Sequence, residues 1–286
     1  MSQQTVSLIE CPRDAMQGWP RMIATNQKIR YINSLLAVGF DTIDFGSFVS
    51  AKAIPQMSDT SQVIAGLDKT ASSTKLLAIV ANQRGAEEAL AHDIIDYLGF
   101  PFSVSPTFQQ KNTNSTIEES LERVETIQNL CIKSGKQLVV YLSMGFGNPY
   151  GDEYNAAILL NRATEIAERG IRIISLADTV GLATPEQISF ALQALIPHYP
   201  GIDFGVHLHS APHQRIAKLE AARAAGCRRF DGALKGIGGC PMAQDELVGN
   251  MDTGLMIDYF GSAGELQSIN KMALQESLRI AGEIFV

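Results

Sequence analysis

Eight short apolar segments alternate with longer amphipathic segments along the 286 residues, and this pattern predicts an α/β fold, a (β/α)8 or TIM barrel with an additional C-terminal helix. The segments LLAIV, LVVYL and IISL are apolar on both faces, as parallel strands covered by helices are. A doubly wound sheet is the alternative. It is less favoured, because no GxGxxG motif follows the first strand.

The expected elements follow from this alternation. Strands are predicted at 5–10, 42–48, 75–81, 94–97, 137–144, 172–178, 203–209 and 229–234. Helical patterns lie at 23–38, 59–68, 84–92, 116–134, 152–169, 185–197 and 213–225, and one long amphipathic pattern follows Asp258. Thr184 with Gln187, and Ser115 with Glu118, have the spacing of capping boxes at helix starts.

The composition excludes several classes of protein. Lys and Arg number 23 against 30 Asp and Glu, so the net charge is −7, and an acidic chain lacks the basic surface that nucleic-acid binding needs. The longest apolar runs fall far short of the roughly 18–20 residues that cross a bilayer, so no membrane association is expected. The N-terminus has no signal- or transit-peptide pattern, and the four cysteines form no CxxC motif. These features predict a cytoplasmic protein with reduced thiols.

Polar residues follow the predicted strands, at the end of the barrel where active sites lie. His207 and His209 are two residues apart on the seventh strand, so both imidazoles point to one face and can share a metal ion. Asp14 follows the first strand and supplies a carboxylate. Two packed histidines without a metal are the alternative. A mixed nitrogen and oxygen ligand set favours Mg²⁺ or Mn²⁺ over structural zinc, for which the sequence has no cysteine cluster.

Two further residues are candidates for catalysis. Arg13 either forms a surface ion pair with its neighbour Asp14 or directs a fixed positive charge at an oxyanion. Cys240 lies in the segment GIGGCP, and on a glycine-rich loop at the active face it would be a proton donor or nucleophile. The other three cysteines are expected to be inert: Cys11, Cys131 and Cys227.

Together these motifs resemble those of the 3-hydroxy-3-methylglutaryl-CoA lyase family, within a larger group of metal-dependent barrel lyases and acyltransferases. The resemblance covers most of the chain, through PRDAMQ, SFVSAKAIPQM, KNTNSTIEES, ADTVGLATP, HLH, GGCPMAQ and GN. SFVS followed by IPQM, and GGCP followed by A-Q, are specific to lyases of this family. The HxH and RD motifs are shared with the whole group.

The resemblance implies a role for each matching residue. Four residues match the family's metal ligands: Asp14, His207, His209 and Asn250. Arg13 matches the arginine that stabilises the enolate oxygen, and Cys240 matches the cysteine of proton transfer. Four residues match positions in the substrate pocket: Gln17, Asp44, Ser47 and Asp178. Asp44 is one methylene shorter than the family's glutamate, and Ser210 and His213 also depart from its pattern.

The implied reaction is a retro-Claisen cleavage of 3-hydroxy-3-methylglutaryl-CoA to acetyl-CoA and acetoacetate, with residues 1–286 as one catalytic domain. His207 or Asp14 would take the hydroxyl proton, Arg13 would hold the enolate oxygen, and Cys240 or a water that it orders would protonate C2. The resemblance also implies an acyl-CoA substrate, a homodimer and a role in leucine degradation.

Two alternatives remain open. The first is a related barrel enzyme that acts on another hydroxyacyl-CoA or condenses acetyl-CoA with a 2-oxo acid. The second is a non-catalytic protein that binds a metal ion or an acyl-CoA.

Overall fold

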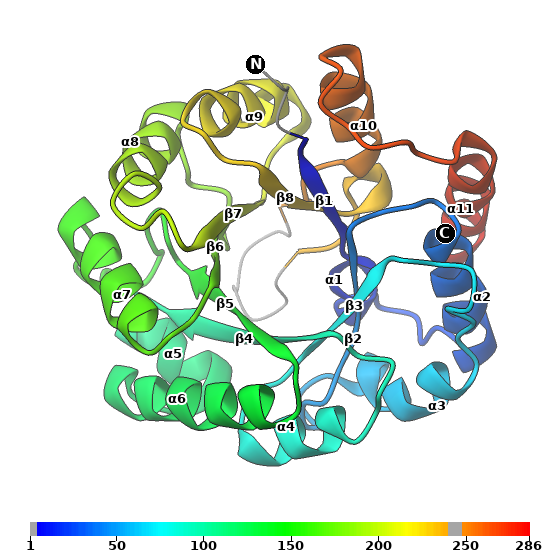
Figure 1. The fold of residues 1–286 in the computed structure, drawn as a ribbon, viewed down its shortest axis with the longest axis horizontal. Helices are drawn as coiled ribbons and strands as arrows, with labels where there is room; N and C mark the ends of the chain where they lie inside the picture. Colours follow the sequence, from blue (N-terminus) through cyan, green and yellow to red (C-terminus); the bar gives the residue numbers. More distant parts are fainter. Residues whose placement is uncertain (1–4, 240–247) are drawn as a thin grey trace.

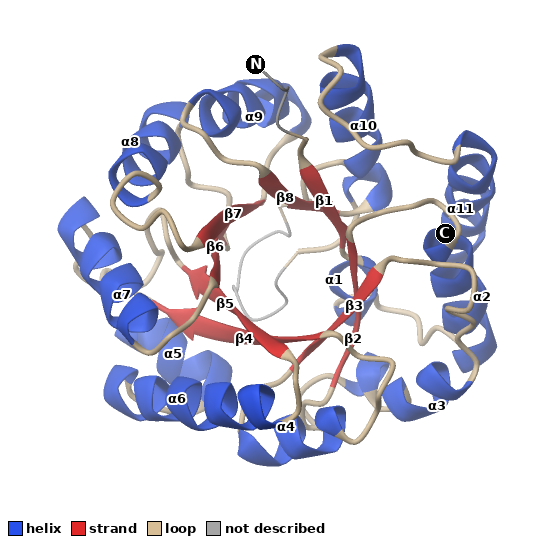
Figure 2. Cartoon of the chain, viewed as in Figure 1, coloured by secondary structure: helices blue, strands red, loops and turns tan. Residues whose placement is uncertain are grey.

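The computed structural model describes residues 5–239 and 248–286. Eight parallel strands follow one another around a closed barrel, in which β1 pairs with both β2 and β8. The strands are β1 (Ser7–Glu10), β2 (Thr42–Ser47), β3 (Lys75–Ile79), β4 (Tyr97–Ser103), β5 (Gln137–Ser143), β6 (Ile173–Asp178), β7 (Asp203–Leu208) and β8 (Arg229–Gly232). They form the inner ring in Figure 2, and the predicted (β/α)8 barrel is confirmed.

Helices surround this ring (Figure 1). They are α1 (Pro12–Gln17), α2 (Thr25–Leu36), α3 (Thr60–Ala65), α4 (Gln83–Leu90), α5 (Pro106–Thr113), α6 (Ile117–Lys133), α7 (Ala156–Glu168), α8 (Pro185–Leu195), α9 (Arg215–Ala224), α10 (Thr253–Ser262) and α11 (Lys271–Ile284). Short 3₁₀ turns lie at Pro55–Met57, Pro212–Gln214 and Leu234–Gly236. The additional C-terminal helix, α11, packs against α2. Among the described helices, none is long and apolar enough to cross a membrane.

The barrel encloses both apolar and polar side chains. Leu77, Ile79, Val139, Tyr141 and Ile173 form a small apolar cluster inside it. The main hydrophobic core lies between the strands and the surrounding helices. Because inward and outward residues alternate along each strand, the last inward residues of the strands face the carboxyl end of the barrel.

The structure corrects the predicted position of one strand. The pattern predicts a strand at 94–97, whereas β4 spans Tyr97–Ser103. Gly99 and Pro101 disfavour a strand by their intrinsic propensities. The fold overrides this preference, because a Cβ at Gly99 would lie 2.5 Å from Ile79 and 3.1 Å from Tyr141. A larger residue at this position would have to displace these neighbouring side chains.

Several helix boundaries also differ from the prediction. Helices α1 and α5 were not expected, and α10 begins at Thr253 rather than after Asp258. The capping box of α8, Thr184 with Gln187, is confirmed. The capping box of α6 lies one residue further along than predicted. It joins Thr116 to Glu119, because the Ser115 hydroxyl is buried against Ser120 and Thr113 instead.

Candidate active site

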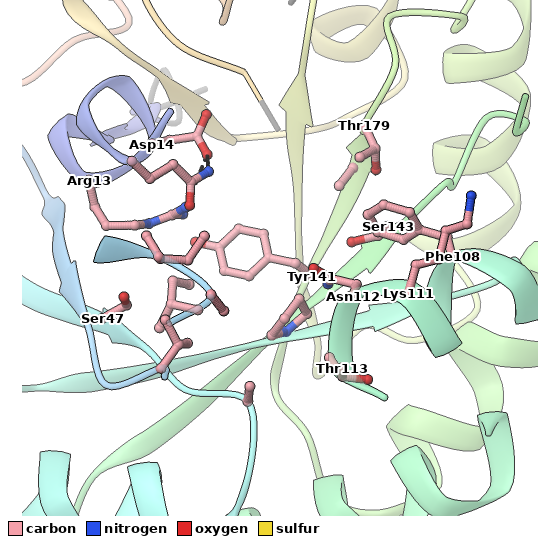
Figure 3. Close-up of a pocket in the computed structure, with 18 of the residues that line it drawn as sticks. Arg13, Asp14, Ser47, Phe108, Lys111, Asn112, Thr113, Tyr141, Ser143 and Thr179 are labelled. Carbon is pink, nitrogen blue, oxygen red and sulfur yellow. Dashed lines mark hydrogen bonds and ion pairs between the residues drawn. The ribbon is translucent and has the colours of Figure 1, made fainter. Parts of the chain in front are cut away.

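A cavity of about 410 Å³ opens at the carboxyl ends of the strands. It is lined by residues from most of the barrel, including Arg13 and Asp14 of α1, Ser47 of β2, His207 and His209. In the view of Figure 3, Arg13 and Asp14 lie on one side of the cavity, Tyr141 lies at its centre, and Lys111 and Asn112 of α5 lie opposite. The structure therefore brings Arg13 and Asp14 together with His207 and His209 at a single cavity.

Asp14, His207 and His209 form a group that could hold a metal ion, since one ligand atom from each lies within 4.8 Å of the others. His209 Nδ1 lies 2.9 Å from the carbonyl oxygen of Thr179. A carbonyl only accepts hydrogen bonds, so Nδ1 carries the proton and Nε2 presents a lone pair. This Nε2 is buried, has no partner among the described residues and lies 3.8 Å from Asp14 Oδ2.

Asn250 reaches the same place from the segment that follows β8. Its Nδ2 donates to Asp14 Oδ2 at 2.7 Å and to the carbonyl oxygen of Ile237 at 2.9 Å. Both partners are acceptors, which fixes the amide orientation and leaves Oδ1 as the free atom. Oδ1 is buried and has no partner among the described residues. Two buried acceptors without donors beside a carboxylate fit a cation, and their nitrogen and oxygen chemistry suits Mg²⁺ or Mn²⁺.

His207 contacts a carboxylate that the sequence analysis missed. Its Nδ1 lies 3.3 Å from Oδ2 of Asp231, an inward residue of β8. Burial lowers the pKa of His207, but the hydrogen bond to Asp231 and the charge of Asp14 raise it above its usual value overall. A carboxylate on one ring nitrogen orients the other nitrogen toward a metal ion or a proton. The sequence did contain a signal for Asp231, because it is an acidic residue within the predicted strand at 229–234.

Cys11, His207 and Asp231 also lie close enough to form a second metal-ligand group. The contact between His207 and Asp231 explains this proximity without a second ion.

Arg13 is buried between two carboxylates. Its Nε lies 3.1 Å from Asp44 Oδ2, its Nη2 contacts the same oxygen, and its Nη1 donates to Asp14 Oδ1 at 3.0 Å. Of the two interpretations of Arg13 that the sequence left open, the surface ion pair is therefore excluded, because Arg13 and Asp14 are both buried. Burial alone would lower the pKa of Arg13, but Asp44 and Asp14 raise it above its usual value, so the charge is permanent. Burial raises the pKa of Asp14, yet Arg13 and His209 hold it well below its usual range.

The substrate-pocket residues predicted from the sequence have different surroundings. Ser47 lines the cavity, and its buried hydroxyl has no partner among the described residues. Gln17 lines it too and donates to Asp14 Oδ1 at 2.7 Å. Asp44 lies behind Arg13, outside the cavity lining.

Asp178 is also absent from the lining. It accepts from Lys218 Nζ at 2.8 Å and from the backbone N–H of Ala183 at 3.1 Å. Cys240 lies outside the described residues.

One wall of the cavity was not expected from the sequence. Lys111, Asn112 and Thr113, at the C-terminal end of α5, line the side opposite Arg13. Lys111 Nζ lies 4.3 Å from the centre of the Tyr150 ring. These residues belong to the KNTN motif, but because no helix was predicted there, the sequence alone did not place them at the site. They add a cationic and amide-bearing edge to an otherwise largely apolar wall.

Comparison with known proteins identifies the family of the chain. The family model described as HMGL-like matches residues 7–280. The chain is 36% identical over 232 residues to a hydroxymethylglutaryl-CoA lyase of Bacillus subtilis. This match covers 81% of this chain and 77% of the relative. It is 32% identical to a 3-hydroxy-3-isohexenylglutaryl-CoA/hydroxy-methylglutaryl-CoA lyase of Pseudomonas aeruginosa, over 84% of this chain and 79% of that protein.

Among solved structures, an HMG-CoA lyase from A. baumannii in complex with coenzyme A and 3-methylmalate superposes with a TM-score of 0.91. The two are 28% identical, and the match covers 100% of this chain and 92% of the other. The Bacillus subtilis HMG-CoA lyase superposes with the same TM-score at 31% identity, over 98% and 94% of the two chains. Because the family model matches almost the whole barrel, and a relative is 36% identical over most of the chain, the chain belongs to the HMGL-like family.

Proposed function

We propose that the protein is a hydroxymethylglutaryl-CoA lyase, a carbon–carbon lyase that cleaves 3-hydroxy-3-methylglutaryl-CoA to acetyl-CoA and acetoacetate. The observation that carries this proposal is the pair of buried, unpartnered atoms beside Asp14, His209 Nε2 and Asn250 Oδ1, with the permanent charge of Arg13 on the same carboxylate. Asp14, His207, His209 and Asn250 would hold Mg²⁺ or Mn²⁺. Such an ion acts as a Lewis acid and lowers the pKa of a hydroxyl group that it binds.

Arg13 would stabilise the charge that develops on the thioester oxygen as the C2–C3 bond breaks. Its guanidinium is held by Asp44 and Asp14 in a fixed orientation, so little reorganisation is needed during the reaction. Asp44 acts in this scheme by orienting Arg13. Ser47 and Gln17 line the cavity and can contact the acyl chain.

The proton of the C3 hydroxyl needs a base, and His207 is better suited than Asp14. Both oxygens of Asp14 already accept hydrogen bonds, from Arg13, Gln17 and Asn250. The Asp231 carboxylate faces His207 Nδ1 and stabilises a protonated imidazole. A nitrogen that binds a cation cannot take up a proton. His207 can therefore act as a metal ligand or as the base, but not as both at the same time. Cys240 would then deliver a proton to C2.

A second substrate class is suggested by the side chains that line the cavity. Several small or apolar side chains line it, among them Ala53, Ile54, Ala81 and Pro101. A substrate that carries a longer apolar branch at C3 would bury that branch against them. We therefore include 3-hydroxy-3-alkylglutaryl thioesters with longer branches as a second candidate class.

We further propose that residues 1–286 act as one catalytic domain, in a homodimer of the cytoplasm that serves leucine degradation.

The experiment is a coupled assay of acetyl-CoA release from a panel of hydroxyacyl-CoA thioesters, with and without a divalent cation. Cleavage of 3-hydroxy-3-methylglutaryl-CoA that needs the cation supports the proposal. Turnover of another thioester alone would favour the related enzymes, and no turnover of any thioester would favour a binding protein.

A further inference from the structure

Glu10 is a buried acid that the mechanism above does not use. It is the last residue of β1 and is fully inaccessible to solvent. Its Oε1 accepts from the backbone N–H of Leu234 at 2.9 Å, and its Oε2 accepts from Thr253 Oγ1 at 2.5 Å. Leu234 lies just after β8, and Thr253 is the first residue of α10. One carboxyl group therefore contacts both ends of the connection that carries Asn250.

The two ends of this connection are packed around Glu10. Glu10 pairs with Gly232 in the register of β1 and β8. A Cβ at Gly232 would lie 2.7 Å from the carbonyl oxygen of Met251 and 3.0 Å from Thr253 Oγ1, so a side chain there would displace the returning segment. The outgoing and returning segments also bond directly to each other. Ala233 N–H donates to Met251 O at 2.9 Å, and Thr253 N–H donates to Ala233 O at 3.1 Å.

We call the contacts of Glu10 with Leu234 and Thr253 the clamp. The segment that carries Asn250 is attached to this clamp at one end and to β7 at the other. Met251 N–H donates to Leu208 O at 3.1 Å, and Ser210 N–H donates to Gly249 O at 2.9 Å. The Asn250 backbone is thereby held between the second candidate histidine ligand and the segment that Glu10 fixes. A shift of the Thr253 end would move Asn250 Oδ1 relative to Asp14.

We propose that Glu10 is a positioning residue for the metal site, which clamps both ends of the connection between β8 and α10 and so sets the place of the Asn250 amide. This inference rests on the metal centre of the proposed function. The energetics of burial agree with it. Burying a polar carboxyl group is costly even when it is protonated, and a leucine would fill the same volume without that cost, so the specific contribution of Glu10 lies in its two contacts.

The test measures Mn²⁺ affinity by calorimetry and the melting temperature of the metal-free protein, in parallel. Glu10→Leu and Thr253→Val remove contacts of the clamp. Glu10→Gln and Thr253→Ser preserve them, because a glutamine can accept from Leu234 and donate to Thr253. Thr74→Val is the matched control, since Thr74 lies just before β3, is also buried, and donates from its hydroxyl to Phe40 O at 2.8 Å. Asn250→Ala removes the candidate ligand itself and should therefore show the largest loss of Mn²⁺ affinity.

The proposal predicts that Glu10→Leu and Thr253→Val weaken Mn²⁺ binding by about 10-fold or more, as loss of a supporting contact does at metal sites. The two conservative variants should bind like the wild type. Thr74→Val should lower only the melting temperature. If Glu10→Leu does not fold, the Thr253 pair decides the question.

Two results would overturn the inference while leaving the metal centre in place: wild-type affinity in Thr253→Val, or equal weakening in Thr253→Val and Thr74→Val. Failure of the wild-type protein to bind Mn²⁺ would instead overturn the proposed metal centre, and the clamp with it.

Discussion

Arg13 shows how much of a residue's role depends on its surroundings. The sequence places it beside Asp14, which is compatible with an exposed ion pair of little consequence. In the structure Arg13 is 8% exposed, and its guanidinium contacts Asp44, a residue of the next strand. No local pattern in the sequence reveals this second carboxylate as its partner. The same contact explains why an aspartate is long enough at position 44: it has to reach Arg13 rather than the cavity.

For Arg13→Met we expect kcat to fall by about 10²–10³-fold, the usual effect of losing one preorganised donor to a developing oxyanion. The variant should also be less stable, since Asp44 would be left buried without its partner. Steady-state kinetics and urea unfolding measure the two effects. The double variant Arg13→Met/Asp44→Asn separates them, because it should regain stability while kcat stays low. A double variant that regains activity would return Arg13 to a purely structural role.

The cysteines give a second prediction at this scale. Cys11, Cys131 and Cys227 are buried. Burial raises the pKa of Cys131 and of Cys227 to about 12, and raises that of Cys11 well above its usual value. We expect a thiol reagent to inactivate the native protein by reaction at Cys240 alone, and a substrate analogue to slow that loss. Peptide mapping checks this, and a label at Cys11 in the native protein would contradict it.

Glu10 should make the stability of the protein depend on pH. Burial raises the pKa of Glu10 to about 8, against 4.5 without burial, although Thr253 and Leu234 lower it. The folded state therefore holds its proton more tightly than the unfolded chain, and stability falls as pH rises from about 5 to 8. In Glu10→Gln this contribution is absent. Urea unfolding at several pH values should show a flatter profile for the variant, and two parallel profiles would be the contrary result.

At the scale of elements, the sequence identified the strands that bring the candidate site residues together but not every element of the site. The spacing of His207 and His209 on an apolar strand was sufficient to align both imidazoles, because alternation along a strand is a local property. Strand β4 was misplaced, since the room for Gly99 beside Ile79 and Tyr141 arises only when the barrel closes. Helix α5 was missed for a related reason: its short, polar sequence has no apolar periodicity.

Lys218 joins three elements and offers a test at this scale. From α9, its Nζ donates to Asp178 Oδ2 at 2.8 Å and to the carbonyl oxygen of His209 at 2.9 Å. Lys218→Met would leave Asp178 as an unpaired buried charge, and we expect a loss of about 3–5 kcal/mol in the free energy of unfolding. Adding Asp178→Asn should recover part of it. A Lys218→Met variant as stable as the wild type would show that this pair does not support β6 and β7.

For the whole molecule, the site exists only because the barrel closes. Asp14 and Asn250 are 236 positions apart, yet the amide of one donates to the carboxylate of the other at 2.7 Å. The match to the HMGL-like family covers residues 7–280, which include all the strands of the closed barrel. What the sequence could not supply is the mutual orientation of side chains from distant strands, such as Asp231 behind His207.

The most direct test of the account is the release of acetyl-CoA from 3-hydroxy-3-methylglutaryl-CoA by the metal-free protein before and after addition of Mg²⁺ or Mn²⁺. Asp14→Asn and His209→Gln serve as variants of the metal site. We expect no release without a cation, turnover once it is added, and little recovery in either variant at the same concentration. Turnover by the metal-free protein, or full activity in both variants, would contradict the central claim that Asp14 and His209 hold a catalytic metal ion.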